Sequence, residues 1–135
     1  MVVYTRTGHV LLLQRADDPE FWQSVTGSLE ACEEPAQAAR RELAEETGLD
    51  VPVHDCQRSA VFEIRECWRS RYPVGTTHNL EHVFLAELES IVDIRLEPEE
   101  HLAFEWVTVN EAIERLWSET NREAVKSELL PRFRA

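Results

Sequence analysis

Three glutamates at helical spacing, Glu42, Glu45 and Glu46, are the part of this sequence best suited to chemistry. In a helix, which turns 100° per residue, they project within one arc of about 100°. Like charges at this spacing cost about 0.2–0.5 kcal/mol per pair, so a purely structural helix would gain from alternating signs. Carboxylate oxygens on one rigid face suit Mg²⁺, which keeps room for water and phosphates. The three glutamates alone fit a solvated acidic helix face equally well, so the surrounding spacing has to decide.

The residues around these glutamates predict a helix from Pro35 to Thr47. Pro35 stands where the first helical residue tolerates proline, and Gly48 stands where a C-cap glycine belongs. The buried side of this helix is expected to be its apolar stripe, which consists of Ala36, Ala39 and Leu43.

The segment Gly27 to Leu49 fits the pattern G-x5-E-x7-R-E-U-x-E-E-x-G-U, in which U is an apolar residue, at every fixed position. This pattern resembles the Nudix box, and its many fixed positions make it a specific signal. The resemblance implies an α/β/α sandwich that hydrolyses a nucleoside-diphosphate-linked or similar pyrophosphate with Mg²⁺ or Mn²⁺. The matched positions are Gly27, Glu33, Arg41, Glu42, Leu43, Glu45, Glu46, Gly48 and Leu49.

The resemblance also implies roles for single residues of the box. Metal ligands are expected at Glu42, Glu45 and Glu46, and catalytic roles at Arg41, Glu45 and Glu46. Glu33 and Arg41 resemble the pair that ties the loop to the helix. Structural positions of the box are expected at Gly27, Glu33 and Gly48. Cys32 stands where the family often has glycine, which makes the detailed shape of the loop an open question.

Hydrolysis of a pyrophosphate also needs a group that accepts a proton from water. A metal ion neutralises phosphate charge and lowers the pKa of a bound water, but a carboxylate still has to take the proton. Glu100, on a predicted loop before a strand at Phe104, is expected to be a metal ligand or this base. The alternatives are that Glu100 is a solvated loop acid and that the base lies within the box.

Segments outside the box resemble the bacterial branch of this family that acts in folate biosynthesis. That branch removes pyrophosphate from dihydroneopterin triphosphate and leaves the monophosphate, which is the function predicted here. Relative to that branch the N-terminus looks short, so a first strand or a substrate contact is expected to be missing. The segments that carry the resemblance are Asp17 to Gly27, Asp55 to Arg58, Phe62 to Ile64, Arg71 to Pro73 with Gly75, Asn79 with Glu81, Glu100 to Ala103, Trp106, Trp117-Ser118 and Asn121-Arg122.

Candidate substrate contacts are cationic or aromatic. Arginine suits bidentate phosphate contact, and a cluster of four lies at Arg58, Arg65, Arg69 and Arg71. The last three share one face if the strand continues; the alternative is a charged edge strand. Aromatic rings could stack on a pterin or could belong to the core. The predicted substrate-binding residues are Arg15, Thr26, Trp22, Phe62 and Arg65.

The composition restricts the class of protein. The chain has 135 residues, 43% hydrophobic and 30% charged, which is typical of one globular domain over residues 1–135. The net charge of -12 disfavours nucleic-acid binding, and no apolar run is long enough for a membrane span. Three cysteines without CxxC spacing and no recognisable signal peptide predict a cytoplasmic protein. Its oligomeric state stays open.

The hydrophobic pattern predicts an α/β (α+β) fold in which helices flank a mixed β-sheet, consistent with a Nudix-like α/β/α sandwich. Strands are expected at Val2–Tyr4, His9–Gln14, Trp22–Thr26, Cys56–Trp68, Asn79–Leu88 and Phe104–Val107. Besides the helix at Pro35–Thr47, helices are expected at Asn110–Trp117 and Arg122–Leu130, with a break around Thr120-Asn121.

Three other functions are alternatives to this prediction. The first is a Nudix nucleoside triphosphate pyrophosphatase that acts on a compound such as dATP. The second, hydrolysis at RNA 5′ ends, is disfavoured by the acidic charge. The third, a Nudix module that binds a ligand without catalysis, predicts a degraded box, whereas this box is intact.

Overall fold

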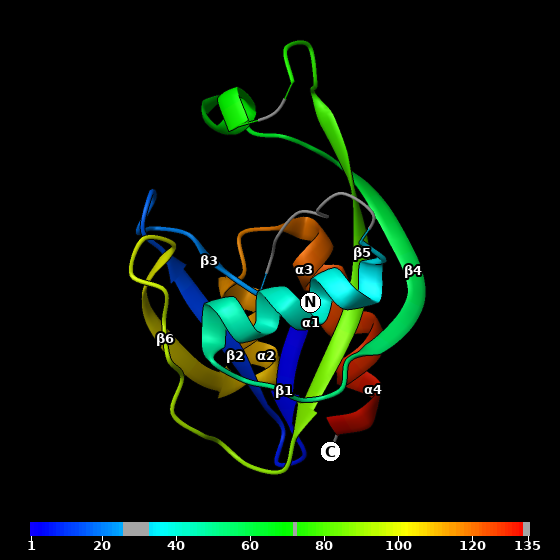
Figure 1. The fold of residues 1–135 in the computed structure, drawn as a ribbon. Helices are drawn as coiled ribbons and strands as arrows, with labels where there is room; N and C mark the ends of the chain where they lie inside the picture. The colour runs from blue at the N-terminus through cyan, green and yellow to red at the C-terminus, as the bar shows by residue number, and fades with distance from the viewer. Residues whose placement is uncertain (26–32, 72, 134–135) are drawn as a thin grey trace.

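The computed structural model describes residues 1–25, 33–71 and 73–133 (Figure 1). Its sheet has the order β3-β2-β1-β5-β4, and β6 pairs with β2. Strand β1 is parallel to β5, and the remaining pairs are antiparallel, so the sheet is mixed as predicted. The strands are β1 (Val2–Thr5), β2 (His9–Arg15), β3 (Trp22–Gln23), β4 (His54–Glu63), β5 (His78–Leu88) and β6 (His101–Thr108).

The helices lie on both sides of the sheet (Figure 1). Helix α1 covers one face and the C-terminal helices cover the other, which is the α/β/α arrangement expected from the sequence. No helix in the described part of the chain is long and apolar enough to cross a membrane. The helices are α1 (Pro35–Thr47), the 3₁₀-helix η1 (Glu66–Arg71), α2 (Val109–Arg115), α3 (Glu119–Ala124), the π-helix η2 (Val125–Leu129) and α4 (Leu130–Phe133).

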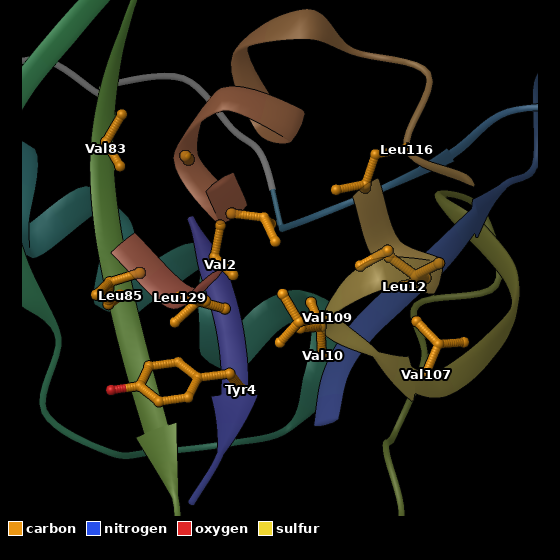
Figure 2. Packing of buried hydrophobic residues seen from close by; sticks show 13 residues of the cluster. Val2, Tyr4, Val10, Leu12, Val83, Leu85, Val107, Val109, Leu116 and Leu129 are labelled. Carbon is orange, nitrogen blue, oxygen red and sulfur yellow. The ribbon is translucent and has the colours of Figure 1, made fainter. Parts of the chain in front are cut away.

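Alternating residues of the central strands divide the core into two layers. Val10 and Leu12 of β2 point toward the C-terminal helices, where they pack with Leu116 and Leu129 (Figure 2). The intervening Leu11 and Leu13 point to the opposite face and pack with Leu43 of α1. Because successive side chains of a strand point to opposite faces, a continuous apolar strand such as this must be covered on both sides.

Helix α1 begins and ends at the predicted residues. Before Pro35, the backbone N–H of Glu34 donates to the side chain of Gln37 at 2.9 Å. At the other end, Gly48 has φ +75° and its N–H donates to the Ala44 carbonyl at 2.9 Å. A side chain at Gly48 would be strained, and its Cβ would lie 3.0 Å from Arg95.

The predicted strand from Cys56 to Trp68 is wrong at its C-terminal end. Strand β4 ends at Glu63, and η1 follows from Glu66. The Arg69 guanidinium turns back to donate to the Ile64 carbonyl and to Glu63, both at 3.0 Å. Arg65 therefore follows the end of β4, and Arg69 and Arg71 belong to η1, so these three arginines do not share one strand face as predicted. Arg58 lies in β4 and its side chain is 3.6 Å from Glu128 of η2.

Strand β4 begins at His54 and β6 at His101, each earlier than predicted, and α2 spans Val109–Arg115 instead of Asn110–Trp117. Strand β3 covers only Trp22–Gln23 of the predicted Trp22–Thr26, of which Thr26 lies outside the described residues. The predicted helix break around Thr120-Asn121 is wrong, since the break lies before Ser118, whose hydroxyl caps α3 by accepting from the Asn121 N–H. Asn121 is buried within α3, where its side chain accepts from the Ser24 N–H and donates to Glu81.

Candidate active site

The Arg41 guanidinium, in the middle of α1, pairs with one glutamate before the helix and with two glutamates on it. Its Nε and Nη2 donate to the two oxygens of Glu33 at 2.8 and 3.0 Å, a bidentate ion pair. Its Nη1 also donates to Glu42 at 2.8 Å and to Glu45 at 3.2 Å. The predicted pairing of Glu33 with Arg41 is confirmed, and one cation partly neutralises three carboxylates.

The three helix glutamates differ in their exposure to solvent. Glu46 has a side chain only 6% exposed, Glu42 is at 16%, and Glu45 is at 55%. Burial raises the pKa of Glu42, and the neighbouring Arg41 guanidinium opposes that shift. Two carboxylates are thus withdrawn from water on one helix face, where a bound cation would favour their ionised form.

The donor set of this face fits a hard divalent cation. Glu42, Glu45 and Glu46 offer carboxylate oxygens only, which is the chemistry that Mg²⁺ and Mn²⁺ prefer. Within the described ranges, no three acidic, histidine or cysteine side chains converge as a preformed metal cage. The fit therefore rests on the oxygen donors and on the burial of Glu42 and Glu46.

A chain of buried polar side chains connects Glu46 to strands β2, β3 and β6. His101 is 2% exposed, and its Nδ1 lies 3.6 Å from Glu46 Oε1. Its Nε2 lies 3.0 Å from Nε2 of Gln23, which is 4% exposed. The Gln23 Oε1 accepts from Arg15 Nη1 at 2.8 Å. Burial, with a smaller effect of Arg15, lowers the pKa of His101 to about 4.

Glu100 lies where the sequence placed it, on a turn immediately before β6. Its carbonyl accepts from the Ala16 N–H at 3.0 Å, which holds this turn against the end of β2. Its side chain is exposed, and the next residue, His101, reaches toward Glu46. Its neighbour His101 thus connects this turn to Glu46 of α1, but the role of Glu100 as ligand or base stays a prediction.

The predicted substrate-binding residues lie in different surroundings. Arg15 has a side chain 13% exposed and forms a bidentate pair with Asp17, both contacts at 2.8 Å. Arg65 lies 4.2 Å above the Phe21 ring and 3.3 Å from Asp18. Both guanidinium groups have partners within the protein, and their assignment to the substrate stays a prediction.

The structure describes the ring of Trp22 but not that of Phe62, the two aromatic residues predicted to bind substrate. Trp22 packs against the core, with the Arg115 guanidinium 4.7 Å from its ring centroid, so one face of the ring is covered. The backbone of Phe62 lies in β4 and pairs with Asn79, but its side chain is outside the described part. Thr26 and the box residue Gly27 also lie outside the described residues.

Sequence reasoning missed Gln23 and His101. His101 was one of five scattered histidines without a metal-binding motif, and Gln23 had no distinguishing neighbour. Their contact depends on β2 pairing with both β3 and β6, which brings Gln23 beside Leu13 and His101 beside Arg15. Only knowledge of this strand order could have found the pair.

Two named proteins are similar to this chain over most of its length. A protein named dihydroneopterin triphosphate diphosphatase, from Haemophilus influenzae, is 45% identical over 135 residues, 96% of this chain and 84% of the relative. The diphosphatase of the same name from Escherichia coli K12 is 43% identical, over 93% of this chain and 87% of the relative.

A solved structure gives the same relationship in three dimensions. The Escherichia coli dihydroneopterin triphosphate pyrophosphohydrolase superposes with a TM-score of 0.92 and 41% identity, over 96% of this chain and 92% of that one. The NUDIX domain model matches residues 1–133. This chain belongs to the Nudix family.

Proposed function

We propose that this protein is a metal-dependent pyrophosphohydrolase that converts dihydroneopterin triphosphate to dihydroneopterin monophosphate and pyrophosphate. The observation that carries the proposal is the similarity to enzymes named for this substrate, at 45% and 43% identity over nearly the whole chain. The TM-score of 0.92 to the Escherichia coli enzyme supports it, because the similarity extends beyond the box to the whole fold.

Glu42, Glu45 and Glu46 would hold a divalent cation, Mg²⁺ or Mn²⁺, with Glu100 as a further ligand or as the base. When bound, the cation neutralises phosphate charge and lowers the pKa of a coordinated water. Helix α1 keeps the three glutamates in fixed mutual geometry, since they lie within two turns of one backbone. Arg41 orients Glu42 and Glu45. It also anchors Glu33, the residue that precedes the helix N-cap.

The remaining tasks are to bind the substrate and to accept a proton. Arg65 lies beside Glu66 and Cys67 in an open surface hollow, and its guanidinium also contacts the Phe21 ring and Asp18, so a substrate phosphate would share this cation with Asp18. The exposed Glu100 carboxylate, on a turn rather than a helix, can approach the phosphates and accept the proton of the attacking water.

The charge of the protein supports a small substrate rather than a polyanion. With a net charge of -12, long-range attraction of nucleic acid is disfavoured, whereas one triphosphate needs only local cations. The proposal therefore includes a small-molecule partner and no nucleic-acid or membrane partner. The cytoplasmic location predicted from the sequence remains part of it.

The test is to identify the products by ³¹P NMR after incubation with dihydroneopterin triphosphate. With Mg²⁺, pyrophosphate and the monophosphate should form together, and the reaction should stop in EDTA and resume when Mg²⁺ is restored. Release of single phosphates, or full turnover in chelator, would contradict the proposed reaction or its metal dependence. The Glu99→Gln variant is a matched control, because it alters an exposed carboxylate that the proposal places outside the metal site.

A further inference from the structure

The buried contacts of Gln23 and His101 determine which ring nitrogen of His101 carries hydrogen. Arginine has only donor groups, so the Gln23 side-chain atom 2.8 Å from Arg15 Nη1 must be its carbonyl oxygen. The other end of the Gln23 amide is then the NH₂ group, which faces His101 Nε2 at 3.0 Å. An NH₂ group can only donate, so His101 Nε2 must accept, and the hydrogen of the neutral ring is on Nδ1.

This Nδ1–H is directed toward the most buried glutamate of α1. Glu46 Oε1 lies 3.6 Å from Nδ1, just beyond hydrogen-bonding distance, and both side chains are at most 6% exposed. Nδ1 has no hydrogen-bond partner among the residues that the structure describes. A small rotation of either side chain would bring the pair into a hydrogen bond, which a buried N–H requires.

We propose that His101 is a positioning residue that presents Nδ1–H to Oε1 of Glu46 and so orients the other carboxylate oxygen for metal binding. Gln23 fixes the ring tautomer, and Arg15, held by Asp17, fixes the orientation of the Gln23 amide. This inference rests on the proposed function, because it takes Glu46 as a metal ligand. It assigns Arg15 an indirect role, different from the phosphate contact predicted from the sequence.

The fold explains why the three side chains can act as one unit. Arg15 and His101 are paired residues of β2 and β6, at a register shift between Gln14 and Arg15. Gln23 belongs to β3, which pairs with the same end of β2. The chain of contacts therefore stands on three adjacent strands, and partners of a metal ligand held this rigidly typically contribute 10-fold to 100-fold, as an order of magnitude, to metal affinity or activity.

Two substitutions of His101 separate this role from a merely structural one. In His101→Asn, the side-chain NH₂ can occupy the place of Nδ1 and still donate to Glu46. In His101→Gln, the amide reaches the place of Nε2 and faces Gln23, so the donor to Glu46 is lost. Both substitutions shorten or reshape the same buried ring, so circular dichroism and thermal unfolding of both variants control for loss of folding.

The decisive readout is Mn²⁺ affinity, measured by the loss of the free-ion EPR signal without any substrate. We expect His101→Gln to weaken Mn²⁺ binding about tenfold or more, and His101→Asn to bind nearly as wild type. In turnover at saturating Mg²⁺, His101→Gln should lower kcat with little change in KM. Equal losses in the two variants, or no loss in either, would overturn the proposal.

NMR of the wild-type protein tests the tautomer without relying on a variant. Long-range ¹H–¹⁵N spectra should show His101 with a protonated Nδ1 and an unprotonated Nε2, and Gln23→Leu should abolish this preference. A wild-type ring protonated at Nε2 would refute the inference. If Mn²⁺ binding and the tautomer are as expected but dihydroneopterin triphosphate is not hydrolysed, the proposed function fails while the role of His101 stands.

Discussion

Loss of the Arg41–Glu33 ion pair should destabilise the protein by a measurable and strongly coupled amount. The pair is bidentate, at 2.8 and 3.0 Å, with side chains 23% and 12% exposed. Exposed pairs contribute up to about 1 kcal/mol, and breaking a fully buried pair costs about 3–5 kcal/mol, so this partly buried one should lie near 2 kcal/mol. Arg41→Ala should cost more, about 3 kcal/mol, because Glu42 and Glu45 lose the same partner.

A double-mutant cycle measures this coupling by urea unfolding of the metal-free protein. Glu33→Ala, Arg41→Ala and the double variant should give losses of about 2, 3 and 3 kcal/mol, so that about 2 kcal/mol is shared. For a chain of this size, each 1 kcal/mol lowers Tm by about 4 °C. Additive losses, with a coupling below about 0.5 kcal/mol, would show that Arg41 does not hold Glu33 and would refute the reasoning.

Three further predictions concern single side chains. Glu46→Gln should lower kcat about 100-fold or more, while the metal-free Tm stays equal or rises, because a buried like charge is removed; a variant that is unfolded or fully active contradicts this. In steady-state kinetics, Glu100→Gln should lower kcat strongly at nearly constant KM, whereas the neighbouring Glu99→Gln should leave kcat nearly unchanged. The reverse result would assign the role to Glu99. Burial and a hydrogen bond to Glu87 raise the pKa of Tyr4 to about 12. The unfolded phenol ionises near pH 10, so the free energy of unfolding should fall by up to about 3 kcal/mol between pH 10 and 12, and urea titrations of Tyr4→Phe should lack this decrease.

Local sequence signals were sufficient to predict α1, the helix that carries Glu42, Glu45 and Glu46. Pro35 and Gly48 mark its ends by fixed backbone preferences, and the positive φ at Gly48 shows why glycine is needed there. The spacing of Glu42, Glu45 and Glu46 then follows from helical periodicity alone. The pairing of Glu33 with Arg41 was expected from the resemblance, and the structure contains it.

Specific polar contacts of single side chains, one local and others between distant segments, were responsible for what the sequence did not predict. The end of β4 depends on Arg69 folding back to the Ile64 carbonyl, a contact that no strand propensity contains. The helical position of Asn121 depends on its buried contacts to Ser24 and Glu81, which are distant in sequence. In each case a polar group that looks like a helix breaker or a surface charge is satisfied by a partner that only the fold provides.

The central claim is that this Nudix chain is specialised for dihydroneopterin triphosphate, and the ratio of kcat/KM for that substrate to kcat/KM for dATP tests it most directly. Both reactions are followed by pyrophosphate release with the same enzyme and the same Mg²⁺ concentration. We expect kcat/KM for dihydroneopterin triphosphate to exceed that for dATP at least about tenfold, equivalent to about 1.4 kcal/mol of transition-state binding. Equal or faster turnover of dATP would contradict it and would indicate a general nucleoside triphosphate pyrophosphatase.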